Sequence, residues 1–370
     1  MHIVFLILII GSNFRAFKAE WNPLIVYEGG ETIGFSTKIE LARSVLCSTG
    51  QSQQQCTILR RNCDKEITTS LCLSSNIPKN ITSMSPTNSS HYIISTIHNT
   101  TDPEFLQFIL PVIEQIVSLP EDKLHPSPIT NSLFTSLVNL ICVDDLKGDT
   151  ISTILSHHDI IGYQQQLMQK CSSAEYFLEV DFARQVQSGA KSIEDFLYYE
   201  NYVSLVQFEM ESLKIYAGNV SINRAVVIGS GPLPLTSVEV LKHLPPSAVI
   251  INYDHSAEAV ELGTIVINKI SRLSVEHRSA LQITAKDLEE VDLVYLAALV
   301  GIDKAEKMEI MKHLYDVMRP GSILIARSAI GLKTLVYRRL TIEEFGEFSN
   351  IQEFHPKDKK VLNSIACGTR

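Results

Sequence analysis

Positive charge is in short supply in this 370-residue sequence. Its 32 lysines and arginines are outnumbered by 41 aspartates and glutamates, which leaves a formal net charge of −9. This balance, with no basic stretch interleaved with aromatic residues, argues against nucleic acid as a partner. Histidine and cysteine do not occur together at spacings typical of metal ligands, so the sequence predicts no metal site.

Long apolar runs are also scarce. The run at residues 3–10 is too short to cross a bilayer, so we expect no stable membrane span from it. Its length suits the core of a signal peptide, although no Lys or Arg precedes it and no small-x-small cleavage site follows it. We therefore predict a signal peptide or a short anchor over residues 1–19. This prediction places the protein in the secretory pathway or outside the cell, with the cytoplasm as the alternative.

Cysteine is concentrated near the N-terminus. Four of the seven cysteines fall within 26 residues of a polar segment, at Cys47, Cys56, Cys63 and Cys72. In an oxidising compartment this pattern predicts two disulfides, with three possible connectivities. N-x-S/T sequons lie at Asn80, Asn88, Asn99 and Asn219. We predict a cysteine-containing module over residues 20–75 and a Ser/Thr/Asn-rich linker over residues 76–102.

A glycine-rich turn occurs in the second half of the chain, in VVIGSGPLPLTSVEVLKHL at residues 226–244. Gly229 and Gly231 follow an apolar run typical of a buried strand. Glycine lets such a turn approach a ligand closely because it has no Cβ. Pro232 and Pro234 remove two of the N–H groups that would hold a pyrophosphate. The turn therefore favours an adenosine-type ligand without a diphosphate, and a purely structural turn is the alternative.

Further strands are expected after this turn. AVIINYD, at 248–254, ends in Asp254, where a carboxylate can accept the two ribose hydroxyls of a nucleoside. Residues 280–301 are predicted to hold a third short strand, then Asp287, a position where an adenine amino group is often met, and then a fourth strand, VDLVYLAAL. MRPGSILIARSA, at 318–329, predicts a turn and a fifth strand.

Helices are predicted between the strands. In the segment 303–318 apolar residues recur at helical spacing, at Met308, Met311, Leu314, Tyr315 and Met318. Strands that alternate with helices indicate an α/β fold with a doubly wound, Rossmann-like sheet, which we place at residues 216–370. Residues 103–215 are predicted to form a preceding helical domain that starts with an amphipathic helix at 103–119. The tail, 343–370, is expected to supply a last strand pair.

Several of these motifs together resemble a known family. IGSGPLPLTS after the first strand, YLAALVG on the fourth and RSAIGLKTLVY on the fifth are similar to motifs of nicotianamine synthases. The resemblance continues upstream in HPSPITNSLFTSLVNLIC (125–142), MQKCSSAEYFLEVDFARQV (168–186) and YYENYVSLVQFEM (198–210). It covers residues 103–340, and its many separate anchors make it specific.

The resemblance implies a reaction. The family condenses three molecules of S-adenosylmethionine into nicotianamine and releases 5′-methylthioadenosine at each transfer. The attacked atom is the methylene of the 3-amino-3-carboxypropyl arm, and the nucleophile is an α-amino nitrogen that must first lose a proton. S-Adenosylmethionine is thus the expected substrate, no metal is required, and the product is nicotianamine or a related metal-chelating compound. The number of transfers and the oligomeric state stay open.

The resemblance also implies where the site residues lie. Glu175 holds the second position of the family's EAE segment and Tyr202 is the tyrosine of its NY segment, so both are expected at the reaction chamber. Glu179 lies one helical turn after Glu175, and two carboxylates that close raise one another's pKa, which suits a proton acceptor. Glu209 is a further catalytic candidate. The residues expected to bind S-adenosylmethionine are Gly229, Ser230, Gly231, Pro232, Asp254, Asp287, Ala297 and Arg327, the last through a substrate carboxylate.

The sequence departs from the family pattern at two places. Ser173 replaces the first carboxylate of the EAE segment. The ribose segment, D-x-D-P-x-A-N in the family, reads NYDHSAE here and differs at Asn252, His255 and Glu258. Asp254 is kept, so ribose binding is still expected, whereas the surroundings of the substrate's amino acid tail differ.

Two other functions fit parts of the sequence. A conventional S-adenosylmethionine-dependent methyltransferase would use the same sheet but leaves the upstream helical motifs unexplained. A secreted binding protein without turnover fits the N-terminal prediction, because S-adenosylmethionine is made in the cytosol, and it also fits the two departures. The nucleoside product distinguishes the three functions: methylthioadenosine, S-adenosylhomocysteine, or neither.

Overall fold

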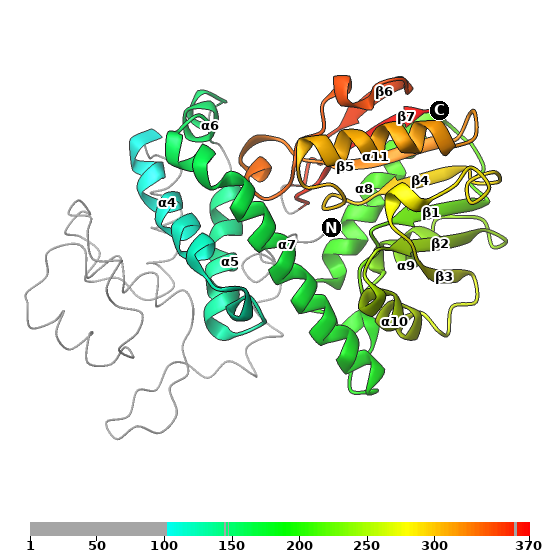
Figure 1. The fold of residues 1–370 in the computed structure, drawn as a ribbon, viewed down its shortest axis with the longest axis horizontal. Coiled ribbons are helices and arrows are strands. Elements are labelled where there is room, and N and C mark those ends of the chain that lie inside the picture. Colours follow the sequence, from blue (N-terminus) through cyan, green and yellow to red (C-terminus); the bar gives the residue numbers. More distant parts are fainter. Residues whose placement is uncertain (1–101, 144–145, 147, 359–360) are drawn as a thin grey trace, which may run out of the picture. The chain divides into compact units, whose positions relative to one another are not determined.

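The computed structural model describes residues 102–143, 146, 148–358 and 361–370 (Figure 1). The predicted signal segment, cysteine module and linker therefore lie outside the described residues. The chain divides into two compact units. The unit that holds the sheet includes Ile113–Cys142 and Leu155–Arg370, and the described part of the other consists of residues 102–112, 143, 146 and 148–154. The predicted division near residue 216 into a helical and a Rossmann-like domain stays a prediction.

Long helices precede the sheet in the chain, as expected. They are α4 (Asp102–Ser118), α5 (Pro128–Ile141), α6 (Gly148–Leu155), α7 (His158–Gln187) and α8 (Tyr199–Ala217). The amphipathic helix predicted at 103–119 is confirmed by α4. Helix α7 is 30 residues long, and one buried row along it carries Leu167, Cys171, Glu175 and Glu179, each four residues after the last. Within the described part of the chain, none of the helices has both the length and the apolar character needed to cross a membrane.

The second half of the chain forms a seven-stranded sheet in the order β3-β2-β1-β4-β5-β7-β6. The strands are β1 (Arg224–Ile228), β2 (Val249–Asp254), β3 (Leu273–His277), β4 (Leu293–Leu296), β5 (Ile323–Ser328), β6 (Ser349–Phe354) and β7 (Ser364–Thr369). Strands β1 to β5 pair in parallel, and β7 pairs antiparallel with both β5 and β6. The predicted α/β fold and the strand pair from the tail are confirmed.

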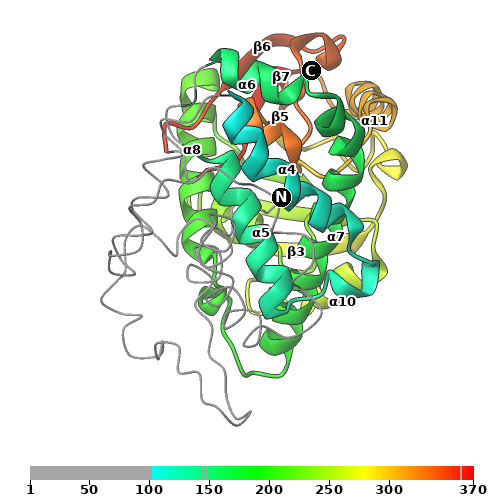
Figure 2. The same cartoon turned by 90° about the vertical axis from the view of Figure 1, so that its left-hand side faces the viewer.

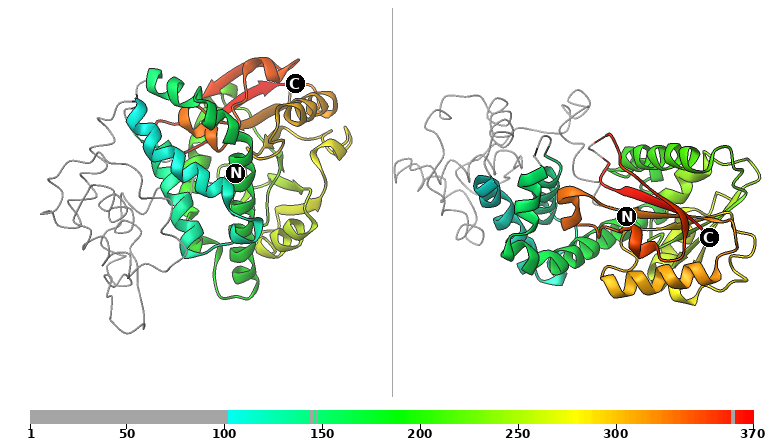
Figure 3. Two further views of the ribbon diagram at one scale, coloured as in Figure 1. Left: turned by 60° about the vertical axis from the view of Figure 1, so that its left-hand side comes forward. Right: turned by 90° about the horizontal axis from the view of Figure 1, so that it is seen from above.

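Helices cover both faces of this sheet. Helix α9 (Leu235–Leu241) follows β1, α10 (Ala257–Val266) follows β2, and α11 (Lys304–Val317) follows β4. Helices α8 and α11 lie on opposite sides of the strands in Figure 2 and in the view from above in Figure 3. Because the chain order reverses at β1, whose neighbours are β2 and β4, the carboxyl ends of these strands form the crevice where α/β sheets bind ligands.

The third strand lies upstream of its predicted place. It spans Leu273–His277, whereas the predicted segment 280–301 begins with a 3₁₀ turn at Ala280–Gln282. Strand β3 is the edge of the sheet, and only Leu273 is buried, so it lacks the apolar run by which a buried strand is recognised. Ala280 and Ile283, which resemble strand residues in the sequence, pack into the core from a loop.

The buried face of α11 differs by one residue from the predicted stripe. Met311, Leu314 and Met318 are buried as expected, but the Met308 side chain is 44% exposed and Lys307 is 2% exposed. The Lys307 Nζ lies 3.5 Å from the carbonyl oxygen of Ala298. Burial lowers the pKa of Lys307 to about 7, because the charged form loses its water. A lysine therefore occupies a core position that the apolar period assigns to its neighbour.

We expect Lys307→Met to stabilise the protein, because replacing a buried charge with an apolar side chain of similar length gains about 1–4 kcal/mol in comparable cases. The gain should be full below pH 7 and should shrink between pH 7 and 10, because the unfolded chain, but not the folded one, binds this proton there. Urea denaturation at several pH values measures it. Lys304→Met, at an exposed position of the same helix, serves as the control; an equal effect in both variants would contradict the explanation.

Candidate functional site

The glycine-rich turn adopts a backbone that requires glycine at two positions. Gly229 has a φ of +79° and Gly231 a φ of +68°. A Cβ at Gly229 would overlap the Val300 side chain and would lie 3.3 Å from the Cβ of Ala297, so the turn packs tightly against the loop after β4. Gly229 and Ala297, both predicted to bind S-adenosylmethionine, thus meet at the carboxyl ends of β1 and β4.

A hydrogen bond from a backbone N–H to a side-chain carboxylate joins this turn to the end of β2. The Gly231 N–H donates to Oδ2 of Asp254 at 2.8 Å, and the Ser256 N–H donates to Oδ1 at 2.9 Å. Each carboxylate oxygen keeps a second lone pair that can accept a hydroxyl. Ser230 is buried, and its Oγ makes no hydrogen bond to any residue that the structure describes. Pro232 follows at a buried position, so the predicted binding residues of the turn and of β2 come together.

Helix α7 brings a carboxylate against the same turn. Glu179 is buried, and its Oε1 accepts a hydrogen bond of 3.1 Å from the hydroxyl of Tyr202 on α8. Its Oε2 lies 2.6 Å from the place where a Cβ at Gly231 would stand, so only glycine leaves room for it. Glu179, Tyr202 and Asp254 therefore surround one point at the carboxyl edge of the sheet.

Burial changes the acidity of this pair. It raises the pKa of Glu179 to about 8, and nearby Asp254 raises it further while the Tyr202 hydrogen bond opposes the shift. Burial also raises the pKa of Tyr202 well above its ordinary value, and the negative charge of Glu179 adds to that effect. Tyr202 is thus a hydrogen-bond donor at neutral pH, whereas Glu179 exchanges a proton near neutrality.

Glu175 occupies the buried row of α7 one turn before Glu179, which confirms that the two carboxylates share a face. The mutual repulsion expected from the sequence is not the largest cause of the raised pKa of Glu179, because desolvation exceeds every other contribution. Burial of a single carboxylate is enough to produce the shift.

Glu209 on α8 and Arg327 on β5 form a buried ion pair. The Arg327 guanidinium donates from Nε to one Glu209 oxygen at 2.6 Å and from Nη2 to the other at 3.0 Å. Nη2 also donates to Oγ1 of Thr236 at 3.1 Å, and both charged side chains are buried. The fork of Arg327 is thus largely occupied by Glu209. Its Nη1 makes no hydrogen bond within the described part of the chain, and it remains the atom available to a substrate carboxylate.

Asp287 is held in the loop that follows β3. Its Oδ2 accepts hydrogen bonds from Arg278 Nη1 at 2.5 Å and from both the N–H and the hydroxyl of Thr284 at 2.7 Å. Arg278 in turn lies over the ring of Tyr253 at 5.4 Å, and its N–H donates to the carbonyl of Asp254 at 2.8 Å. These bonds fix the loop of Asp287 against the end of β2.

Comparison with known proteins identifies this arrangement. The sequence pattern of the family described as "Nicotianamine synthase protein" matches residues 98–370. The chain belongs to the nicotianamine synthase family. Nicotianamine synthase 1 of Arabidopsis thaliana is 30% identical over 273 residues, which cover 70% of this chain and 84% of that protein. Nicotianamine synthase of Solanum lycopersicum is 32% identical over 268 residues, which cover 69% and 82%.

Solved structures of the protein MtNAS share the fold of this chain. The crystal structure of MtNAS in complex with MTA and tNA superposes with a TM-score of 0.56 at 19% identity, over 70% of this chain and 96% of that one. A crystal structure of a point mutant of MtNAS gives a TM-score of 0.57 at 18% identity, over 70% and 96%. The recognition made from the sequence motifs is confirmed.

The positions that depart from the family pattern have structural roles here. Asn252 is buried, donates to the Ser274 carbonyl at 2.9 Å and accepts from the Ser237 hydroxyl, so it ties β2 to its neighbours. His255 is 83% exposed at the side chain. Glu258 accepts hydrogen bonds from Tyr176 and Arg184 of α7. Sequence reasoning missed Tyr176 and Arg184, because their partner lies 82 and 74 residues away and no local pattern signals such a contact.

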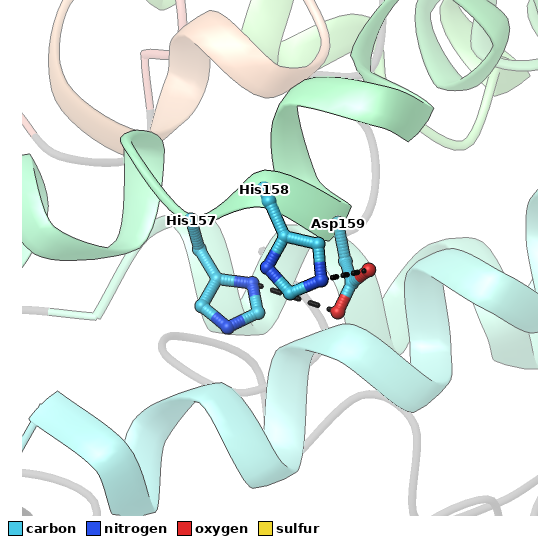
Figure 4. A group of neighbouring side chains, drawn as sticks. All are labelled: His157, His158 and Asp159. Carbon is cyan, nitrogen blue, oxygen red and sulfur yellow. Dashed lines mark ion pairs between the residues drawn. The ribbon is translucent and has the colours of Figure 1, made fainter.

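A second cluster of polar side chains lies at the start of α7 (Figure 4). His158 Nε2 is 2.9 Å from Oδ1 of Asp159, and His157 Nδ1 is 3.7 Å from Oδ2. It is the group of potential metal ligands found among the described residues. The three residues are consecutive at a helix N-terminus, whose positive end attracts the carboxylate and opposes a cation. We therefore attribute the cluster to the start of the helix.

We expect Gly231→Ala to destabilise the protein more than Gly189→Ala. Both glycines have positive φ, at +68° and +76°, so each variant incurs a backbone cost of about 1–2 kcal/mol. Only the Gly231 variant also displaces Glu179, because space is open around Gly189. Chemical denaturation measures both. Adding Glu179→Ala to Gly231→Ala should recover part of the extra loss, and equal losses in the two single variants would contradict the predicted clash.

Proposed function

We propose that this protein is a nicotianamine synthase that transfers the 3-amino-3-carboxypropyl group of S-adenosylmethionine to an α-amino nitrogen and releases 5′-methylthioadenosine. Membership of the family supports the proposal, and so does the match to synthases that extends over more than four-fifths of their length. In the transfer, the bond between sulfur and the arm's methylene carbon breaks as the new carbon–nitrogen bond forms. Repeated transfers between S-adenosylmethionine molecules build the nicotianamine skeleton.

The turn at the end of β1 is the place for the nucleoside. We assign the ribose hydroxyls to the free lone pairs of Asp254, which Gly231 and Ser256 hold in position. Asp287 lies in the loop after β3, and Ala297 lies directly after β4 against the glycine turn. We assign both to the adenine. The two prolines of the turn suit this ligand, because a nucleoside without a diphosphate does not need the N–H groups that proline lacks.

The observation that carries the proposal is the place of Glu179. An α-amino group is mostly an ammonium at neutral pH and attacks only after it loses a proton. Glu179 has a pKa of about 8 and lies against the turn assigned to the nucleoside, so it is a proton acceptor matched to that amine. A bound sulfonium would favour the ionised carboxylate by Coulomb attraction and so would prepare the acceptor when substrate arrives.

The neighbouring residues have separate assignments. The hydroxyl of Tyr202 holds the Glu179 carboxylate and orients the proton acceptor. Glu175 stays a candidate for the same role, because it is buried on the same face of α7. Glu209 is bound by Arg327, so we assign the pair to the support of α8 against β5, with Nη1 of Arg327 directed to a substrate carboxylate.

The two alternative functions receive no support from the comparisons, because the family match extends through the upstream helices that a methyltransferase leaves unexplained. The secretory location remains our proposal and rests on residues 1–102, outside the described part. Detection of glycans or disulfides on protein from its native source tests it.

We expect Glu179→Gln to lower turnover by about 10²–10⁴, because glutamine keeps the hydrogen bond from Tyr202 but cannot accept a proton. In the wild type, log kcat/KM should rise with pH with a slope of two below pH 7, because the substrate must first become the neutral amine and Glu179 must be ionised to take the further proton that this nitrogen sheds as the carbon–nitrogen bond forms. The variant should keep only the slope of one from the substrate. Methylthioadenosine release measures both.

Glu175→Gln is the matched comparison for this prediction. If it removes the second proton from the pH profile and Glu179→Gln does not, the acceptor is Glu175. Stability gives an independent reading. The folded pKa of Glu179 is raised from 4.5 to about 8, so the wild type should lose stability relative to Glu179→Gln as pH rises through that window, and the difference should be constant above it.

We expect Asp254→Ala to weaken binding of S-adenosylmethionine by at least about 10–200-fold, because each charge-assisted hydrogen bond to a ribose hydroxyl is worth about 1.5–3 kcal/mol. Calorimetric titration of wild type and variant measures the change. The replacement also frees the Gly231 N–H, so a small loss of stability accompanies it. Asp316→Asn, at an exposed carboxylate of α11, is the control, and equal affinity in all three proteins would remove the ribose assignment.

A further inference from the structure

Helix α7 is tied to the loop after β2 by a group of polar side chains. The hydroxyl of Tyr176 donates to Oε2 of Glu258 at 2.9 Å and lies 2.9 Å from Oγ of Ser256. Two turns further along the helix, Nη2 of Arg184 donates to the other oxygen of Glu258 at 2.7 Å. Glu258 thus holds α7 at two points, two turns apart, on either side of Glu179.

The same loop holds the residue assigned to the ribose. The Ser256 N–H donates to Oδ1 of Asp254, while its hydroxyl caps α10 by accepting from Ala259 N–H at 3.2 Å. Asp254 in turn binds the N–H of Gly231, the residue against which Glu179 lies. A continuous path of hydrogen bonds therefore runs from Tyr176 on α7, through the loop after β2, to the glycine turn.

We propose that Tyr176, Arg184 and Glu258 form a latch that sets the position of Glu179 on α7 relative to the nucleoside turn. They are positioning residues, because they bind one another and the loop after β2 and act through the helix. The consequence for catalysis rests on the proposed role of Glu179, but the consequence for its position does not. Glu258 replaces the family's usual Asn at this place, so the charged member of the latch belongs to the departure noted in the sequence.

The latch fixes the position of α7 and contributes little to the free energy of unfolding. The side chains of Arg184 and Glu258 are 63% and 45% exposed, and an exposed ion pair contributes little to the free energy of unfolding. Tyr176 is half-buried, and its hydroxyl joins the exposed pair to the interior. A small movement of α7 would admit water to Glu179, whose raised pKa has burial as its largest cause. The titration of Glu179 therefore reports on the latch.

The test titrates Glu179 directly in the ligand-free protein. Carbon-13 NMR of protein labelled at the glutamate carboxyl follows each carboxylate with pH, and Glu179→Gln identifies the signal by its loss. Two other described titratable residues affect the pKa of Glu179, namely Tyr202 and Asp254. Neither is substituted in the latch variants or in the control. Tyr176→Phe and Glu258→Gln open the latch. Asp181→Asn is the control, because its carboxylate accepts an exposed hydrogen bond from Gln185 within α7 and makes no bond to the loop.

We expect a Glu179 midpoint near 8 in the wild type and in Asp181→Asn, and a midpoint lower by about one unit or more in Tyr176→Phe and Glu258→Gln, since hydration restores the ordinary acidity. The double variant should shift at least as far as either single one, because Tyr176→Phe removes the hydroxyl contact and Glu258→Gln weakens the ion pair with Arg184. An unchanged midpoint in both latch variants would overturn the proposal. In the wild type, raising sodium chloride from about 0.05 to about 1 M should move the midpoint in the same direction, because salt screens the exposed pair. The same salt series on Glu258→Gln, which lacks the charged pair, gives the part of the shift that comes from screening of Asp254, and a shift equal to that of the wild type would overturn the proposal.

Kinetics separates the latch from the proposed function. With both correct, the second proton in the pH profile of kcat/KM moves to lower pH with the NMR midpoint, and kcat falls while the affinity for S-adenosylmethionine changes less than threefold. A shifted NMR midpoint with an unchanged kinetic profile supports the latch and removes Glu179 as the acceptor. A changed affinity with an unshifted midpoint places the latch residues in substrate binding and overturns the proposal as stated.

Discussion

The hydrogen bond between the Gly231 N–H and the Asp254 carboxylate is the contact on which the rest of the site depends. It joins the ends of two neighbouring parallel strands, β1 and β2, at the point where the strand order in the sheet reverses. Gly231 can make it only with a positive φ, and that same backbone leaves the space that Glu179 fills. One backbone conformation thus brings together the carboxylate assigned to the ribose and the one assigned to proton transfer.

Two buried carboxylates at this site are treated in opposite ways. Glu209 faces the two-pronged guanidinium of Arg327, so its charge is balanced within the protein. Glu179 accepts a hydrogen bond from the hydroxyl of Tyr202, and burial raises its pKa to about 8. The first arrangement suits a permanent charge that supports the fold, and the second suits a group that must change its charge during a reaction. For Lys307, a buried cation, the same desolvation penalty lowers the pKa instead of raising it.

The parts of the structure that the sequence predicts are those with a local or periodic signal. The sequence shows the glycine turn and Asp254 at the ends of two strands. Because parallel strands end at one edge of a sheet, the two are expected to lie close together, and Gly231 and Asp254 do meet there. Strand β3 escaped this reasoning because an edge strand needs little apolar surface. Lys307 escaped it because periodicity assigns a core position to an apolar neighbour. The contacts of Glu258 with α7 join residues more than seventy positions apart, and a single sequence contains no sign of them.

The sheet and the helix that carries Glu179 come from separate stretches of the chain, and the division has a chemical meaning. A sulfonium offers three carbon atoms to a nucleophile, and holding the nucleoside does not choose among them. On the proposed function, the sheet places the sulfur, whereas α7 and α8 decide from which side a deprotonated amine arrives. On the proposed function, the regiochemistry of the transfer is therefore set outside the nucleotide-binding fold. A change in the tilt of one long helix could redirect the attack to another carbon without altering a single strand.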